Sequence, residues 1–406
     1  MTPVFDVTII GGGLVGTSLA IALQHSGLAV ALIEAAMPQV LSQSRDDERN
    51  LALARASTVA LQTLGVWPRL MAVATPIERL HVSRVGEFGS LRLAAGEAGL
   101  AAFGAVVPAR QLGQALQQEL EMCTRIHRYM PAELAALETG ADYASVRLHT
   151  PDGEVVLATR LLVGADGTAS RVRALCGLGT EDVDYAQTLF ACSLLPQRPL
   201  DGLAYERFSD SGPVALLPLA ERRAGLVLSV PAGEAAATAA LDDAAFLALA
   251  QQRFGWRAGR FSRPGRRSAH AIRRVVARSI TAPRCVLVGN AAQTLHPIGA
   301  QGFNLGLRDA LTLAQLLIDA ERSGSDPGAA ALLQRHAALR REDREGTMAF
   351  SDGLVRLACH PARLLSPLRS LGLLLLDGLP QAGAWVARRG MGFRGRPTAY
   401  AQGYLP

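Results

Sequence analysis

The chain has 406 residues, of which 49% are hydrophobic and 19% charged. It is therefore long enough for two or three domains and too apolar to be disordered. All 41 basic residues are arginine, and the formal net charge of +6 is mild for this length. Because the sequence contains no dense basic run and no nucleic-acid motif, we do not expect a nucleic-acid partner.

The cysteines and the first residues bear on the cellular compartment. The five cysteines are odd in number, widely spaced and free of C-x-x-C pairs, which argues against a disulfide framework or a zinc site, and we expect no metal. The N-terminus lacks the basic and apolar regions of a signal peptide, and no apolar window is long enough to span a bilayer. These features favour a cytoplasmic protein, with peripheral contact to the inner membrane as an alternative.

A βαβ unit begins almost at the first residue. Val7–Ile10 is a short apolar strand, 11–16 is a tight turn, Thr17–His25 has helical spacing, and Val30–Ile33 is a second strand that ends at Glu34. Residues 45–70 then resemble a loop followed by a helix. The next predicted elements are strands within 77–96, a helix at 111–122, a hairpin pairing 145–149 with 154–157, and a buried strand at 161–163.

The sequence pattern changes from about 184 to 280, where short β-like runs alternate with polar turns. A strand at 286–288 follows, and a helix begins near Gly302. Residues 310–345 and 350–390 hold helical segments. The apolar run Leu371–Leu376 predicts either a helix or subunit contact or, alternatively, contact with a membrane surface.

The first turn carries the motif G-x-G-x-x-G, written here as Gly11-Gly12-Gly13-Leu14-Val15-Gly16. It follows a strand, opens a helix and is followed by Glu34 at the end of the next strand, which is the context of a dinucleotide site. We expect Gly13 to let a pyrophosphate approach the backbone and Glu34 to accept hydrogen bonds from a ribose. The motif alone does not distinguish NAD from FAD.

Two further strand–turn–helix motifs lie downstream. In Leu161–Arg173, Asp166 ends the strand, where it could bind a ribityl or ribose hydroxyl group, cap the next helix, or do both. In the stretch 286–310, a strand, a glycine-rich loop and a helix N-terminus together favour an electron-rich group, because backbone N–H groups and the helix dipole point at it.

With all three motifs in this order, the sequence resembles the flavoprotein aromatic hydroxylases, the family of para-hydroxybenzoate hydroxylase. Segments such as 206–218 and 254–259 are similar to the ubiquinone-biosynthesis branch of that family. The resemblance implies an α/β fold: a Rossmann-like FAD-binding domain, an inserted β-sheet-rich substrate domain and C-terminal helices. The boundaries it suggests are FAD-binding parts at 1–76, 101–183 and 281–345, substrate-domain strands at 77–100, a β-rich substrate domain at 184–280 and a C-terminal helical region at 346–406.

The resemblance also implies which residues bind FAD. They would hold the ADP half, the pyrophosphate or ribityl chain, and the isoalloxazine ring, and they are Gly11, Gly13, Leu14, Val15, Gly16, Glu34, Arg49, Arg110, Asp166, Gly289, Asn290, Pro297, Gly302, Phe303 and Asn304. Alternatively, the charges of Arg49 and Arg110 are structural or simply solvated. The Pro297 carbonyl would orient the reacting groups, and His296 is a candidate for proton handling, although a histidine before proline is more often structural.

The distal motif departs from the family pattern at three positions. Asn290 occupies the position of an aspartate, and Gln293 occupies that of a histidine. Ala300 occupies the position of a loop glycine, and the glycine is one position earlier here, at Gly299. At these positions we expect the flavin contacts to differ from those of the family pattern.

The implied reaction is hydroxylation of a polyprenylated phenol, 2-polyprenyl-6-methoxyphenol, in ubiquinone biosynthesis. NAD(P)H would reduce FAD, and O₂ would form a flavin C4a-hydroperoxide that transfers oxygen to the ring. Two alternatives remain: a related hydroxylase of another aromatic substrate, or a non-catalytic flavoprotein scaffold in a biosynthetic complex. A homo-oligomer or a ubiquinone-biosynthesis complex is a further expectation.

Overall fold

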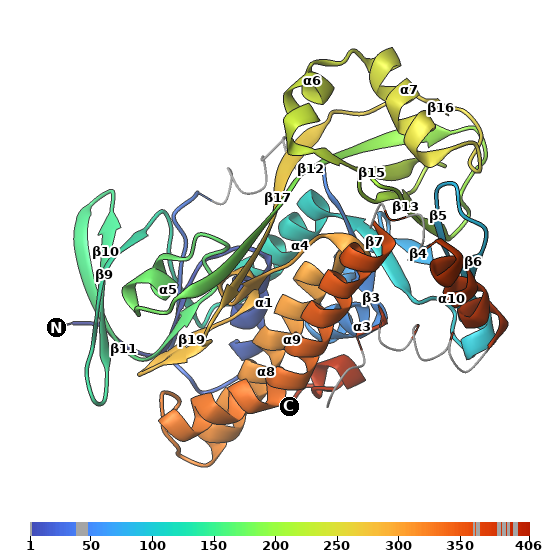
Figure 1. Ribbon diagram of the computed structural model, residues 1–406. Coiled ribbons are helices and arrows are strands. Elements are labelled where there is room, and N and C mark those ends of the chain that lie inside the picture. Colours follow the sequence, from blue (N-terminus) through green and yellow to red (C-terminus); the bar gives the residue numbers. More distant parts are fainter. Residues whose placement is uncertain are drawn as a thin grey trace.

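The computed structural model describes residues 2–37, 48–359, 362, 366–379, 383, 387, 390–392 and 397–406. Three sheets and their covering helices form a mixed α/β fold over these ranges. The two larger sheets occupy opposite halves of the molecule, and the long strands β12 (Thr180–Pro196) and β17 (Ser268–Ala277) extend from one half into the other (Figure 1).

The first sheet has a parallel centre. Its strands follow the order β18 (Thr281–Ala282), β19 (Cys285–Leu287), β11 (Gly153–Gly164), β1 (Val4–Ile10), β2 (Val30–Ile33) and β8 (Ile126–Tyr129). From β19 to β8 all neighbouring pairs are parallel, so their carboxyl ends meet at one edge. The antiparallel strands β9 (Glu133–Thr139) and β10 (Ala144–Thr150) extend the sheet from β11.

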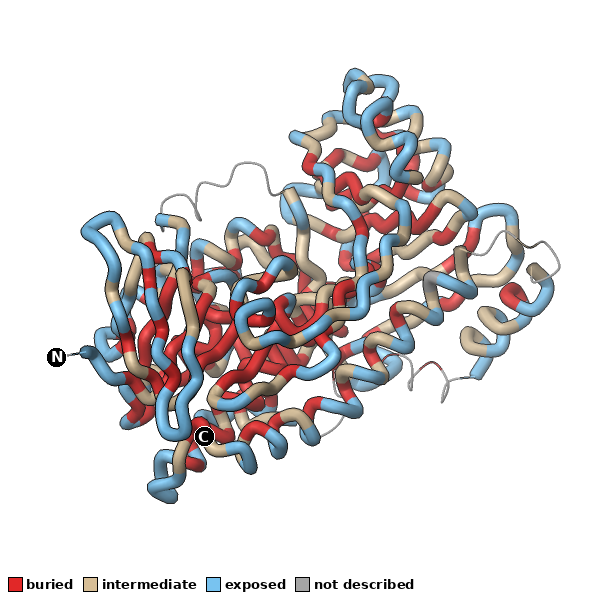
Figure 2. The backbone as a smooth tube through the Cα atoms, turned by 60° about the vertical axis from the view of Figure 1, so that its left-hand side comes forward, coloured by how far each residue is buried: buried red, intermediate tan, exposed pale blue. Residues whose placement is uncertain are grey.

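Both faces of this sheet are buried, which explains why its strands are continuously apolar. Ile9 packs in a core with helices α1 (Leu14–Leu23), α4 (Ala109–Glu121) and α8 (Gln301–Arg322). Its neighbour Ile10 faces a second core with α5 (Arg171–Leu175). Figure 2 shows the resulting concentration of buried residues at the centre of this half.

The second sheet has nine strands. Its order is β20 (Gln293–Thr294), β17, β12, β15 (Ala224–Pro231), β14 (Val214–Pro218), β13 (Leu203–Phe208), β5 (Arg79–Arg84) and β6 (Ser90–Ala94), and β16 (Phe261–Ser262) pairs with β12. Phe246 and Phe254 of α7 (Asp243–Phe254) pack on its outer face. The short helix α6 (Ala235–Ala240) precedes α7.

Four details differ from the sequence-based expectations. The strands predicted at 154–157 and 161–163 are one strand, β11, and the sheet-rich stretch contains strands of up to 17 residues rather than short runs. That stretch also contains α6 and α7; the start of α7 is signalled by Asp242, whose carboxylate accepts a hydrogen bond from the Ala245 N–H at 2.8 Å. Within 45–70, β3 (Asn50–Ala54) is a strand and not part of a loop.

The third sheet joins the two halves. It consists of β3, β7 (Gly104–Pro108) and β4 (Thr75–Ile77), with α3 (Arg55–Thr63) directly after β3. Because β3 pairs with β7, about fifty residues later, its strand character depends on a non-local partner that a local pattern does not reveal. Ile77 and Val106 of this sheet pack against Ala204 of the nine-stranded sheet.

Two long helices lie against one another through buried charges. Arg308 on α8 and Arg340 on α9 (Ala330–Ala358) both bind Asp343, and Arg340 also binds Asp309 at 2.7 Å. All four side chains are at most 10% exposed. The network therefore fixes α9 on the face of α8.

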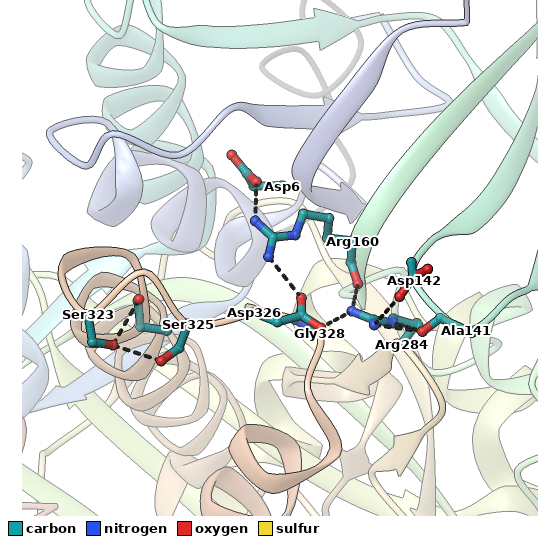
Figure 3. Close-up of polar contacts among 10 residues, drawn as sticks. Asp6, Ala141, Asp142, Arg160, Arg284, Ser323, Ser325, Asp326 and Gly328 are labelled. Atoms are coloured by element: carbon teal, nitrogen blue, oxygen red, sulfur yellow. Dashed lines mark hydrogen bonds and ion pairs between the residues drawn. The ribbon is translucent and has the colours of Figure 1, made fainter.

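The opposite end of α8 is tied to the parallel sheet (Figure 3). Arg160 donates to Asp6 at 3.2 Å and pairs with Asp326, which also accepts from Arg284. Gly328 lies so close to the Arg160 carbonyl that a Cβ atom would approach its oxygen to 2.0 Å. These contacts hold the α8–α9 connection against the sheet and so help to set the position of α8.

Helix α10 (Ser366–Gly378) lies beside β6 at the edge of the nine-stranded sheet (Figure 1). Arg369 on its inner side is buried and pairs with Glu87. Across the residues that the structure describes, no helix combines the length and apolarity needed to cross a bilayer.

Candidate cofactor and substrate site

The glycine motif forms the turn between β1 and the N-terminus of α1. Gly11 has φ +106°, and a Cβ atom there would lie 2.5 Å from the Ala165 oxygen, while one at Gly16 would lie 1.9 Å from the Gly11 oxygen. At Gly13, the N-cap of α1, a Cβ atom would meet no atom of the described residues within 4 Å. No side chain in this part of the chain caps α1, so its first N–H groups, including those of Leu14 and Val15, face this open space.

Glu34 lies beside this turn at the end of β2. Its carboxylate accepts hydrogen bonds from the N–H groups of Gly12 at 2.6 Å and Ala36 at 2.9 Å. Each carboxylate oxygen has a further lone pair, and the side chain is only partly buried. Glu34 thus braces the turn and still has acceptor capacity for a ligand.

Arg49 and Arg110 are brought together by the pairing of β3 with β7. The Arg49 carbonyl accepts a hydrogen bond from the Ala109 N–H at 2.9 Å, at the start of α4. Helix α4 runs beside α1, where Gln117 donates to the Gly12 carbonyl at 3.3 Å. Both arginines are exposed and lie on segments that border the N-terminus of α1.

Asp166 follows β11 at the same edge of the sheet. Its carboxylate accepts from the Ser170 hydroxyl at 2.6 Å and from the N–H groups of Arg171 and Val172 at 2.7 and 3.0 Å. Asp166 therefore does support the N-terminus of α5, one of the two roles that the sequence leaves open. Its partial exposure leaves the second role available.

Arg173, to which sequence reasoning gives no role, connects the middle and distal motifs. Its guanidinium donates to the Thr168 carbonyl at 2.7 Å and to the Ala291 carbonyl at 2.8 Å, and it is 9% exposed. Arg173 lies on α5, the helix that follows the turn after Asp166, and this position is its sequence signal. Arg173 fixes the two turns relative to one another.

The distal turn packs directly on α1. Gly289 has φ +60°, and a Cβ atom there would lie 3.1 Å from the Val15 side chain. On the other side, Gly306 of α8 approaches the Gly289 Cα so closely that a Cβ atom would lie 2.9 Å away. Asn290 is exposed beside this contact. The first and last motifs, nearly 300 residues apart, thus form one site.

The loop before α8 has an unusual backbone. Gly299 and Ala300 have φ values of +65° and +50°. Ala300 thus adopts a left-handed backbone conformation, which is unfavourable for residues other than glycine. Pro297 is exposed, and its carbonyl accepts from the Ala300 N–H at 3.0 Å. A Cβ atom at Gly302 would meet nothing within 4 Å in the described ranges, whereas the Phe303 ring packs partly into the core.

Asn304 holds this loop in place. Its amide donates to the Ala52 and Ala300 carbonyls at 2.9 and 2.8 Å, and its oxygen accepts from the Ala54 N–H at 2.8 Å. The side chain is 2% exposed. Because three of its four hydrogen-bonding positions are occupied by the protein, Asn304 connects the loop to β3, 250 residues earlier.

His296 is buried beneath the same loop. Its Nδ1 accepts from the Ile298 N–H at 3.2 Å, and its Nε2 lies 3.4 Å from the Gln187 oxygen, an arrangement that favours a neutral ring with the proton on Nε2. Burial lowers the pKa of His296 to about 4. A ring with these partners and this pKa is suited to shaping the loop and is a poor proton acceptor at neutral pH.

Buried neutral histidines predict a pH-dependent stability. Burial also lowers the pKa of His336 on α9 to about 4, below the unfolded value of about 6.5. Between these values the unfolded chain takes up protons that the folded chain does not. The free energy of unfolding should therefore fall, as pH decreases, by up to roughly 1.4 kcal/mol per pH unit for each histidine.

Denaturant unfolding at pH 7.5 and 5.0 measures this dependence. Neither His336 ring nitrogen has a partner among the residues that the structure describes, so His336→Leu loses no hydrogen bond and should flatten the dependence. An identical pH dependence in wild type and variant would show that His336 does not contribute.

Comparison with known proteins identifies the family. A family model described as an FAD binding domain matches residues 4–346. The chain belongs to this family. The match includes all three motifs and both large sheets, so it covers more than the nucleotide fingerprint.

Two relatives and a solved structure of similar fold agree with the match. The chain is 36% identical to "Ubiquinone hydroxylase UbiL" of Rhodospirillum rubrum over 96% of this chain and 90% of the relative. It is 32% identical to "3-demethoxyubiquinol 3-hydroxylase" of Escherichia coli over 93% and 95%. The fold is similar to that of p-nitrophenol 4-monooxygenase PnpA from Pseudomonas putida, with a TM-score of 0.81, 16% identity, and coverage of 98% and 100%.

These findings confirm the predicted fold class, the cofactor FAD and the enzyme class, an FAD-dependent monooxygenase. The site geometry fits this cofactor. The uncapped N-terminus of α1 and the open space at Gly13 suit a pyrophosphate, and the open space at Gly302 lies at the second helix N-terminus. NAD(P)H is the electron donor typical of this class.

Proposed function

We propose that this enzyme hydroxylates a polyprenylated phenol in ubiquinone biosynthesis, with 2-polyprenyl-6-methoxyphenol as the substrate. The observation that carries the proposal is the similarity to two ubiquinone-pathway hydroxylases over more than 90% of this chain, including the nine-stranded sheet. A similarity limited to the cofactor site would not bear on the substrate in this way.

The residues of the site then have separate tasks. The N–H groups at the start of α1 would bind the pyrophosphate, with Arg49 and Arg110 at its border, Glu34 would accept from a ribose, and Asp166 would accept from a sugar or ribityl hydroxyl. Once bound, FAD supplies the redox chemistry that activates O₂. The protein contributes position, electrostatics and exclusion of water.

The loop residues would hold the ring system of FAD. Gly289 and Asn290 would lie at the ribityl side. Pro297, Gly302 and Phe303 would border the isoalloxazine, with the N–H groups at the start of α8 favouring negative charge on it. Asn304 acts as a positioning residue, because its amide is occupied by the protein.

Complementation tests the proposal. Expression of the gene in a bacterial strain that lacks its methoxyphenol hydroxylase should restore ubiquinone, and mass spectrometry should show the accumulated precursor disappear. The gene could instead fail to restore ubiquinone in that strain and restore it in a strain blocked in demethoxyubiquinol hydroxylation. This result would assign hydroxylation to the ring position that demethoxyubiquinol hydroxylases modify. Failure in both would favour a different aromatic substrate or a non-catalytic scaffold.

We also propose that α10 contacts the membrane in which a polyprenylated substrate resides. Its exposed leucines form an apolar stripe together with Leu379, the residue after the helix. The stripe consists of Leu368, Leu371, Leu374, Leu375 and Leu379, with exposures from 43% to 67%. An exposed apolar stripe on a helix, in a protein of positive net charge, favours an anionic lipid surface.

Vesicle co-sedimentation checks this contact. The wild type should bind vesicles that contain an anionic phospholipid. The double variant Leu371→Gln/Leu375→Gln should bind at least about tenfold more weakly, because each buried leucine contributes roughly 1.5–3 kcal/mol. If the wild type stays in the supernatant and instead forms oligomers that the double variant abolishes, the stripe is a subunit contact.

A further inference from the structure

Glu206 occupies a defined place on the inner face of the nine-stranded sheet. It lies on β13, in register with Val82 of β5 and Ala215 of β14, so these three side chains share one face. Two residues earlier on that face, Ala204 packs against the three-stranded sheet, and two residues later Phe208 packs against Ile298 of the loop before α8. Glu206 therefore lies between these two contacts.

This place is next to the predicted isoalloxazine loop. Asn304 ties that loop to β3 of the three-stranded sheet, and Asn50 of β3 lies against Gly225 on the neighbouring β15. The inner face of the sheet, β3 and the loop thus surround the same space. Apolar Val82 and Ala215 flank the Glu206 carboxyl on either side.

The Glu206 carboxyl has no partner for its charge. Among the residues that the structure describes, none forms a hydrogen bond or ion pair with it, whereas Asp210 nearby pairs with Arg84 and Asp352 accepts from Tyr185. Burial alone raises the pKa of Glu206 to about 8, yet the side chain keeps a partly exposed surface. The Glu206 carboxyl is thus desolvated, while its side chain is not fully enclosed by the described residues.

An unpaired carboxyl in such surroundings lowers stability, and a role toward a ligand accounts for its presence. An aromatic substrate placed against the isoalloxazine loop would present its ring to the apolar side chains around Glu206. The hydroxyl group of this substrate would supply the hydrogen-bond donor that the Glu206 carboxyl lacks.

We propose that Glu206 is a catalytic residue that accepts a hydrogen bond, and then the proton, from the phenolic hydroxyl group of the substrate. The inference rests on the proposed function. In the step, the phenol O–H bond breaks and its electron pair stays on the phenol oxygen, while a new O–H bond forms on the carboxylate. The negative charge moves from Glu206 to the ring, which becomes more electron-rich for attack on the oxygen donor.

Other titratable or charged groups face the same region and belong to any pH profile. They are Arg84 on β5, Asp210 after β13, Tyr185 on β12, His296 before the loop, Asp352 on α9 and Cys359 directly after α9. Burial raises the pKa of Tyr185 to about 12 and that of Cys359 to about 11, and lowers that of His296 to about 4. None of these three pKa values lies near 8. A limb of the pH–rate profile near pH 8 is therefore expected from Glu206.

The variants Glu206→Gln and Glu206→Asp test the proposal in the FAD-loaded full-length enzyme. The probe is a methoxyphenol with one short prenyl chain, and Glu181→Gln, an exposed glutamate on β12, is the control. Glu206→Gln should keep FAD affinity, lose hydroxylation by about 100-fold or more, and lose the limb near pH 8. Glu206→Asp should recover at least part of the rate and keep a limb.

A readout without turnover completes the test. With FAD but no NAD(P)H present, the wild type and the control should shift the bound probe toward the phenolate absorption band, and Glu206→Gln should not. Unchanged hydroxylation and pH profile in Glu206→Gln would overturn the proposal, as would equal losses in both Glu206 variants without a change in the phenolate band. A wild type that binds FAD but hydroxylates no phenol would contradict the proposed function itself.

Discussion

Replacing Gly13 with alanine will abolish tight FAD binding and leave the protein folded. Gly13 has φ −70°, which alanine adopts readily, and the added Cβ atom meets no atom within 4 Å among the residues that the structure describes. It enters the space in front of the N-terminus of α1. Each charge-assisted hydrogen bond to phosphate that it displaces is expected to lower affinity by about tenfold or more, since such bonds contribute roughly 1.5–3 kcal/mol.

The measurement is FAD titration of the apoprotein by flavin fluorescence, with thermal unfolding of the same samples. Gly13→Ala should show a melting temperature close to that of the wild-type apoprotein. Gly16→Ala is the matched contrast, because its Cβ atom would lie 1.9 Å from the Gly11 oxygen and should destabilise the apoprotein. Wild-type FAD affinity in Gly13→Ala would show that the pyrophosphate binds elsewhere.

Replacing Arg340 with methionine will lower the free energy of unfolding by about 3–5 kcal/mol, the usual effect of removing one partner of a buried ion pair. Arg340 binds Asp309 and Asp343, each at 2.7 Å, and its loss leaves both carboxylates with fewer donors in a buried place. Because Asp309 also accepts from Gln293, the change should propagate to the distal motif.

Denaturant unfolding of the apoprotein checks this effect without a contribution from FAD. Arg341→Met is the matched control, since Arg341 is exposed on the next position of α9 and its replacement should change stability by less than about 0.5 kcal/mol. Equal stabilities of the two variants would mean that the network contributes no net stability.

The sequence predicts the cofactor half of the fold well because its signals are local. The first strand, the glycine turn and α1 follow one another, and each shows its own apolar or glycine pattern. Helix α1 begins at Leu14, inside the turn predicted at 11–16 and three residues before the predicted helix start at Thr17. Helix α8 likewise begins at Gln301, next to the predicted start at Gly302.

The remaining features depend on partners far away in the chain. β3 is a strand because it pairs with β7, and Asn304 is a positioning residue because β3 lies beside it. Arg173 connects two turns that are distant in sequence, and its role is visible only when both turns are placed. Gln293 replaces a histidine of the family pattern, and the structure shows its amide between Asp309 and Arg344.

Glu206 illustrates the same limit for the substrate side. In the sequence it is one charged residue in a strand of mixed character, and nothing local distinguishes it from an exposed glutamate. Only the register of β13 with β5 and β14 places it on the inner face, opposite the loop before α8.

Incorporation of labelled oxygen tests the central claim most directly. The purified enzyme, loaded with FAD and supplied with NAD(P)H, ¹⁸O₂ and a prenylated methoxyphenol, should release a product that carries one labelled oxygen atom on the ring. A protein that cannot be loaded with FAD, or one that consumes NAD(P)H without labelling any ubiquinone precursor, would contradict the account.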